Sequence, residues 1–132
     1  MARKDYTSIL ITGASRGLGK AMATALAQAG AHVYLVGSVA ETIQAVADEL
    51  SQADLQADPL PADLSTDDGI ASLVETLKEK LTHLYVLVNN AGLGHKAPLL
   101  TGETDQWKEM LDVNVLALLI CSREAVKDMQ KN

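Results

Sequence analysis

The chain has no phenylalanine, and aromatic residues make up only 3% of its 132 positions. We therefore expect a core built from aliphatic side chains, which the apolar share of 48% can supply. Cysteine occurs once, as Cys121, so an internal disulfide is excluded and a reducing compartment is favoured. Because Cys121 lies at the end of an apolar run, we expect a buried thiol rather than a reactive one.

Basic residues are scarce as well, with 11 Lys and Arg against 17 Asp and Glu, and the formal net charge is −6. This balance argues against binding of nucleic acid or of an anionic membrane through a basic surface. The apolar run at residues 113–121 is about half as long as a membrane-spanning helix requires. No targeting segment is recognised, so we expect a cytoplasmic protein. The histidines lack the spacing of metal ligands, and no metal site is predicted.

Four strand patterns alternate with four helix patterns along a chain whose length suits one domain. We expect strands at residues 8–12, 32–36, 54–60 and 84–89, and the prolines at 59 and 61 mark the third as an edge strand. Helices are expected at residues 17–29 and 40–51, from a Ser65 cap through Leu81, and at 104–130. Such alternation predicts a parallel sheet with helices on both faces, which is a three-layer, Rossmann-like α/β fold.

The first strand pattern runs directly into three glycines with the spacing G-x-x-x-G-x-G, at Gly13, Gly17 and Gly19. An alanine-rich helical pattern follows at once. Small residues let a backbone approach a pyrophosphate, and the first N–H groups of a helix supply donors and partial positive charge. A tight turn without a ligand is the alternative. A P-loop is excluded because Ala14 stands where its first glycine is needed, and the spacing G-x-G-x-x-G is absent.

The stretch from Thr12 to Gly19 resembles the cofactor motif of the short-chain dehydrogenases/reductases. Three later landmarks match that family in order and spacing, namely Asp63-Leu64, Asn89-Asn90-Ala91-Gly92 and Asn114. The resemblance implies strand order 3-2-1-4, truncated after the fourth strand and the helix that follows it. Residues 1–132 are then an NAD(P)-binding Rossmann half-domain, with the ligand crevice at the carboxyl ends of strands one and four.

For the cofactor, the resemblance implies a pyrophosphate cradle made by the three glycines, with Ser15 and the Leu18 backbone beside it. It pairs Arg16 with the 2′-phosphate of NADP, since a guanidinium suits phosphate geometry, although a solvated turn arginine is the alternative. Where NAD selectivity usually needs a carboxylate, the chain has Ser38. NADP is therefore the expected cofactor and NAD the alternative.

The resemblance also assigns roles to residues after the third and fourth strands. Asp63, with Leu64 next to it, corresponds to an aspartate that accepts a bond from the adenine amino group; a turn residue is the alternative. Asn90 corresponds to an asparagine that braces the central strands and, with Ala91 and Gly92, shapes the cofactor pocket. His95 follows in the loop where the family holds substrate and nicotinamide, so a minor binding role is possible.

Hydride transfer in this family uses Asn, Ser, Tyr and Lys, the last two as Tyr-x-x-x-Lys. Asn114 is the member found here, and none of the three tyrosines has a lysine four positions later. We expect the NADP(H)-binding portion of an oxidoreductase that is inactive by itself; a non-catalytic nucleotide-binding module is the alternative. An apolar edge at residues 85–89 and one face of the helix at 104–130 are expected to pair with a second copy or with a C-terminal half.

Overall fold

The computed structural model describes residues 7–80 and 83–131. Its four strands form one parallel sheet in the order β3-β2-β1-β4, as expected. The strands are β1 (Ser8–Thr12), β2 (His32–Gly37), β3 (Ala57–Pro61) and β4 (Val86–Val88). The position of β3 at one edge confirms the prediction made from its prolines, because a proline cannot donate to a neighbouring strand.

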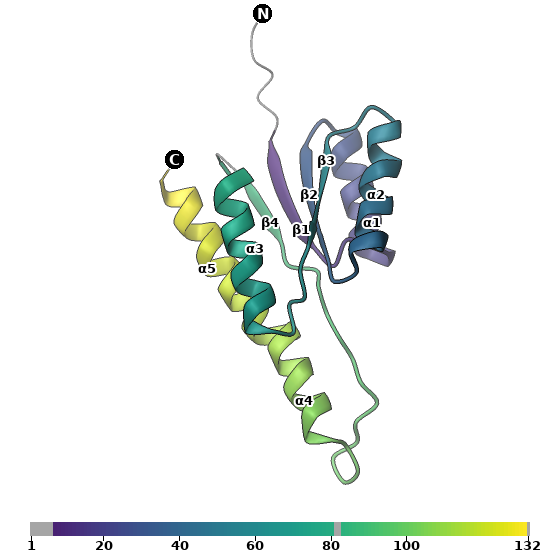
Figure 1. Cartoon of the computed structure of the whole chain (residues 1–132), viewed down its shortest axis with the longest axis vertical. Helices are drawn as coiled ribbons and strands as arrows, with labels where there is room; N and C mark the ends of the chain where they lie inside the picture. Colours follow the sequence, from purple (N-terminus) through teal and green to yellow (C-terminus); the bar gives the residue numbers. More distant parts are fainter. Residues whose placement is uncertain (1–6, 81–82, 132) are drawn as a thin grey trace, which may run out of the picture.

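Helices cover both faces of the sheet, which gives the three layers seen in Figure 1. One face carries α1 (Gly17–Gln28) and α2 (Ala40–Gln52), and the other carries α3 (Asp67–Lys80) and α5 (Ala117–Gln130). Two further segments, α4 (Thr104–Leu111) and the π-helical η1 (Asp112–Leu116), lead into α5. Leu81, expected in the third helix, lies outside the described residues.

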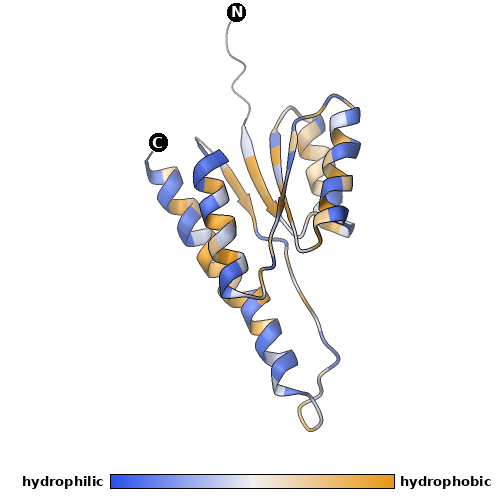
Figure 2. Cartoon of the chain, viewed as in Figure 1, coloured by the Kyte–Doolittle hydropathy of each residue, from blue (hydrophilic) through white to orange (hydrophobic). Residues whose placement is uncertain are grey.

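The alternation of side chains along β1 explains the two cores. Ile9 and Ile11 pack with α1 and α2, whereas Leu10 packs with the residues of α3 and α5. Both groups are buried, so the strand is apolar on both faces, as is usual for an inner strand of a parallel sheet. Figure 2 shows hydrophobic residues along the strands and hydrophilic ones on the outer sides of the helices.

The strand β4 is shorter than the predicted span of residues 84–89. Among the described strands it pairs with β1, from Val86 opposite Ile9 to Val88 opposite Ile11. Beyond Val88 the chain turns, because the N–H of Asn90 donates to the carbonyl of Val88 and to Thr12 Oγ1. The pairing of β4 with β1 therefore ends at this point, where the N–H of Asn90 bonds to the side chain of Thr12.

The predicted cap of the third helix was wrong by one residue. Thr66 Oγ1 accepts a hydrogen bond from the N–H of Gly69 at 3.0 Å, which is the contact of an N-cap residue. Ser65 instead donates through its hydroxyl to Asp63 Oδ1 at 2.6 Å. Ser65 and Thr66 are adjacent residues that could both cap a helix. The hydroxyl of Ser65 bonds to the carboxylate of Asp63, and Thr66 is the residue that caps α3.

The predicted helix at residues 104–130 is not uniform, because η1 interrupts it with one wide turn. A π-helical turn inserts an extra residue and is frequent at functional sites. Asn114 lies in the middle of η1. Together α4 and the preceding loop extend away from the sheet (Figure 1). No helix among the described residues is both long and apolar enough to cross a membrane.

Candidate nucleotide-binding site

A cavity of about 450 Å³ opens at the carboxyl ends of the strands. Its walls come from the turn after β1, the end of β2, the segments after β3 and β4, and the α4–η1 helix. Every predicted cofactor residue except Gly19 lines it: Gly13, Ser15, Arg16, Gly17, Leu18, Ser38, Asp63, Leu64, Asn90, Ala91 and Gly92. Tertiary structure thus brings four separate stretches of chain to one cavity.

The three glycines of the turn are required for different reasons. Gly13 and Gly17 have φ angles of 67° and 58°, in the left-handed region that favours glycine. At Gly17 an added Cβ would meet no atom within 4 Å. Glycine is favoured there by its φ angle, and a side chain would project into open space. At Gly19 an added Cβ would overlap the carbonyl of Gly13 and approach Asn90 Nδ2 at 2.5 Å. Gly19 therefore allows close packing behind the cavity instead of lining it.

The N-terminus of α1 faces this cavity without a side-chain cap. Arg16 is the residue before the first turn, its backbone is extended, and its side chain makes no capping hydrogen bond. The first turn carries no acidic residue. Free N–H groups and the positive end of the helix dipole are thus available to an anion in the cavity.

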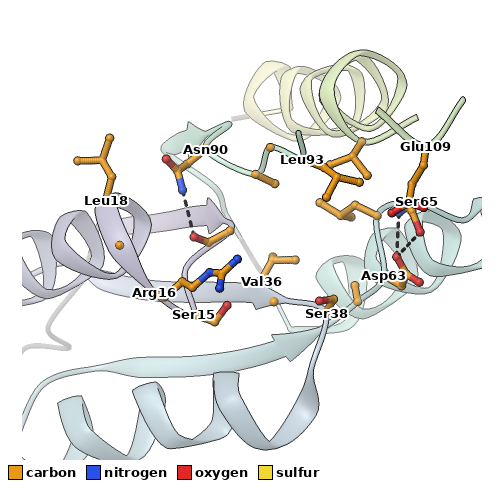
Figure 3. Close-up of a pocket in the computed structure, with 18 residues that line it drawn as sticks. Ser15, Arg16, Leu18, Val36, Ser38, Asp63, Ser65, Asn90, Leu93 and Glu109 are labelled. Carbon is orange, nitrogen blue, oxygen red and sulfur yellow. Dashed lines mark hydrogen bonds between the residues drawn. The ribbon is translucent and has the colours of Figure 1, made fainter. Parts of the chain in front are cut away.

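A network of hydrogen bonds joins the ends of β1 and β4. The buried Thr12 Oγ1 accepts bonds from the N–H groups of Asn90 and Ala91 at 3.1 and 3.0 Å. Asn90 Nδ2 donates to the carbonyl of Gly13 at 3.0 Å (Figure 3). Asn90 thus connects the two strands, as the resemblance implied. The sequence assigns Thr12 no role beyond its place in the motif. Its hydroxyl, at the end of an apolar strand, is the feature that could have indicated this contact.

Asp63 is held in place by its neighbour. Its Oδ1 accepts bonds from both the hydroxyl and the N–H of Ser65, at 2.6 and 2.9 Å. The hydroxyl first and the N–H second lower the pKa of Asp63, so the carboxylate remains an acceptor near neutral pH. Leu64, the next residue, is buried against α3 and α5.

Arg16 and Ser38 both line the cavity, Arg16 from the turn after β1 and Ser38 from the loop after β2. In Figure 3 the guanidinium of Arg16 points across the pocket toward the end of β2, where Val36 and Ser38 lie. The residues that end β2 and begin the next loop, Val36-Gly37-Ser38, carry no carboxylate. A negatively charged group in this part of the pocket would therefore meet one cation and one hydroxyl.

Asn114 does not line the cavity but fixes the segment that does. Its Oδ1 accepts from the N–H of Leu93, and its Nδ2 donates to the carbonyl of the same residue, both at 2.8 Å. The amide thus pairs with both backbone polar groups of Leu93 and holds the chain after β4 against η1. Cys121, in contrast, is buried, and burial raises the pKa of its thiol, so it remains protonated.

Several lining residues were not found from the sequence: Val36, Gly37, Ala62, Ser65, Leu93, Glu109 and Val113. Most of them adjoin a predicted residue in the chain. Glu109 and Val113 differ, because they reach the cavity from the α4–η1 helix, far from the motifs in sequence. No local signal marks them, since only the direction of that helix brings them to the pocket.

The family model described as "short chain dehydrogenase" matches residues 7–132. The chain belongs to the short-chain dehydrogenase/reductase family. "Dehydrogenase/reductase SDR family member 11" of Gallus gallus is 40% identical over 124 residues, which are 92% of this chain and 49% of the relative. A 3beta-hydroxysteroid dehydrogenase of Mediterraneibacter gnavus is 36% identical over 131 residues, 98% of this chain and 48% of the relative.

Solved structures of the family agree with the fold. A metagenomic short-chain oxidoreductase in complex with NADP matches with a TM-score of 0.86 and 35% identity, over 93% of this chain and 56% of that one. L-sorbose reductase from Gluconobacter frateurii, complexed with NADPH and L-sorbose, matches with a TM-score of 0.89 and 27% identity, over 96% and 48%. The chain spans about half the length of the curated relatives it matches.

Proposed function

We propose that this chain is the NADP(H)-binding portion of a short-chain dehydrogenase/reductase. When complete, such an oxidoreductase transfers hydride between nicotinamide and a carbonyl or alcohol substrate. The observation that carries this proposal is the meeting of the glycine turn, the Asp63 segment and the Asn90 segment around one cavity. The bound NADP or NADPH of the solved relatives supports it.

The chain fits the dinucleotide at its most demanding point, the pyrophosphate. Gly13 leaves no space for a side chain, and Gly17 presents an open surface toward the cavity. We assign the pyrophosphate to this turn, with Ser15, the N–H of Leu18 and the N-terminus of α1 as donors. Gly19 contributes by letting α1 pack close to Gly13.

The choice of NADP over NAD rests on Arg16 and Ser38. A guanidinium can pair with a 2′-phosphate, and no carboxylate at the end of β2 would repel that phosphate. Asp63 and Leu64 are assigned to the adenine, which is attached to the same ribose as that 2′-phosphate. Asn90, Ala91 and Gly92 are assigned to the side nearer the nicotinamide. NAD remains the alternative cofactor.

Turnover is a separate matter from binding. Asn114 is the assigned member of the family's catalytic set, and its side-chain amide bonds to the N–H and the carbonyl of Leu93. None of the chain's tyrosines is followed by the lysine that would lower the pKa of a phenol. We therefore propose that the chain alone binds nucleotide and does not reduce carbonyls. A non-catalytic nucleotide-binding module is the second candidate. It is favoured by the same observation, that no lysine stands four positions after a tyrosine.

An apolar surface supports a proposal about partners. In the strand β4, Val86 is 40% exposed, and the preceding Tyr85 is 53% exposed. The consecutive segments α4, η1 and α5 expose a further set of apolar side chains: Leu111, Val115, Leu116, Leu118, Leu119 and Val126. Apolar edges and patches of this kind recruit partners. We propose that this face pairs with a second copy or with a C-terminal half, in the reducing cytoplasm that a single cysteine favours.

Two measurements test these proposals together. Calorimetric titration with NADPH and NADH is expected to give saturable binding, tighter for NADPH, while an assay of carbonyl reduction by the chain alone is expected to be blank. Absence of binding to both nucleotides would contradict the function. Sedimentation over a range of concentrations is expected to show association; a monomer at all concentrations would contradict the proposed pairing with a second copy.

A further inference from the structure

Glu109 lines the cavity but belongs to none of the motifs described above. It lies in α4, and its side chain is 47% exposed. The charged residues among those that line the cavity are Arg16, Asp63 and Glu109. Figure 3 shows Glu109 at the same end of the pocket as Asp63 and Ser65, away from Arg16. The pocket thus has a cationic end and an end with two carboxylates.

Two carboxylates in the pocket of a polyanionic nucleotide need an explanation. Ionised carboxylates repel phosphate, and they contribute to the affinity for a nucleotide where they accept hydrogen bonds from its donors. At the Asp63 end, the proposed ligand presents the adenine base. The exocyclic amine of adenine is an uncharged group with two N–H donors, which is enough for two acceptors.

The carboxylate of Glu109 is not fully used within the protein. His95 Nε2 lies 3.6 Å from Glu109 Oε1, within ion-pair distance but too long for a hydrogen bond. Among the described residues, His95 Nε2 has no hydrogen-bond partner. The loop around His95 is held by other contacts. The N–H of His95 donates to Met110 Sδ, and Trp107 Nε1 donates to the carbonyl of Ala97 at 3.0 Å. Glu109 is therefore available to a ligand without releasing the loop.

We propose, resting on the function proposed above, that Glu109 is a second carboxylate that selects the adenine base. One N–H of the amine bonds to Asp63 and the other to Glu109. A 6-oxo base such as hypoxanthine has a carbonyl oxygen at this position, and this oxygen would face both carboxylates. Glu109 thus adds discrimination against 6-oxo bases beyond that of Asp63 alone.

The experiment compares NADPH with reduced nicotinamide hypoxanthine dinucleotide phosphate, which differs only in the base. Dissociation constants are measured by calorimetry for the unmodified chain, Glu109→Gln and Glu79→Gln. Glu79 is exposed on α3 and does not line the cavity, so its variant has the same change of charge. We expect the preference for NADPH to fall roughly tenfold in Glu109→Gln and to be unchanged in Glu79→Gln.

A further variant tests whether Glu109 acts on the adenine base directly or through the loop around His95. His95→Ala removes the ring next to Glu109 and is expected to keep the preference for adenine. Equal weakening of both nucleotides in Glu109→Gln, or an unchanged preference, would overturn the assignment of Glu109 and leave the proposed function intact. Loss of the preference in His95→Ala would also overturn it, because the loop would then be responsible. If the unmodified chain binds neither nucleotide, the proposed function fails, and this inference fails with it.

Discussion

The side-chain amide of Asn90 donates to the carbonyl of Gly13 at 3.0 Å and thereby joins two residues 77 positions apart in the chain. Gly13 begins the glycine turn, and Asn90 follows β4. Both residues line the cavity, and the backbone of Asn90 is held at the same time by Thr12. One amide and one hydroxyl thus extend the connection between β1 and β4 beyond their backbone pairing.

Replacing Asn90 with alanine is expected to lower the free energy of unfolding by about 1 kcal/mol, because a partly buried carbonyl loses its donor. Nucleotide affinity is expected to fall as well, since the bond that holds the carbonyl of Gly13 beside the cavity is lost. Urea denaturation and NADPH titration measure the two effects. Asn89→Ala is the control, because Asn89 is exposed and its side chain donates to Ser122 Oγ at 3.0 Å, away from Gly13. Equal losses in the two variants would show that the connection across the crevice has no special role.

Gly17→Ala and Gly30→Ala form a matched pair. Both glycines have positive φ angles, 58° and 101°, and both would place a Cβ in open space, but only Gly17 lines the cavity. Each change is expected to cost about 1 kcal/mol of stability through backbone strain. Only Gly17→Ala is expected to lose NADPH binding, as its methyl group would occupy the phosphate position. Unimpaired binding by Gly17→Ala would count against the pyrophosphate assignment.

Arg16→Ala is expected to weaken binding of NADPH roughly tenfold, because a charge-assisted hydrogen bond to phosphate is lost. NADH lacks the 2′-phosphate, so its affinity is expected to change little. Calorimetry with both nucleotides measures the ratio. Lys20→Ala serves as the control, since Lys20 is a nearby cation that pairs with Glu49 at 3.0 Å and does not line the cavity. If Arg16→Ala weakens both nucleotides equally, Arg16 does not read the 2′-phosphate.

Alkaline pH is expected to destabilise the fold through Tyr34. Burial, and then the negative charge of Asp58, raise the pKa of Tyr34 above its usual value of 10.0. A raised pKa means that the neutral phenol's contribution to stability is complete below the pKa of the unfolded chain. It is lost as pH rises through the higher pKa of the folded chain. Above pH 10, the free energy of unfolding is expected to fall more in the unmodified chain than in Tyr34→Phe. The difference between their absorbance titrations reports the ionisation of Tyr34 directly. Identical pH profiles would refute this.

Much of the fold could be read from neighbouring residues. The apolar run at Ile9–Leu10–Ile11 gave β1 with its observed ends, and the prolines of β3 marked an edge strand. The start of α1 at Gly17 also followed from its motif. The cap of α3 was misplaced because Ser65 and Thr66 are equivalent in the sequence, and only the contact with Asp63 distinguishes them.

The sequence alone was sufficient for the strands, the glycine turn and the residues next to each motif, because their conformations depend on a few adjacent side chains. Tertiary structure decided where β4 ends, where the last helix widens into η1, and that Glu109 reaches the cavity. These features depend on contacts between residues far apart in the chain, such as Thr12 with Asn90 and Leu93 with Asn114. Such contacts leave no periodic or local pattern, since they form only when packing of the helices on the sheet brings the partners together.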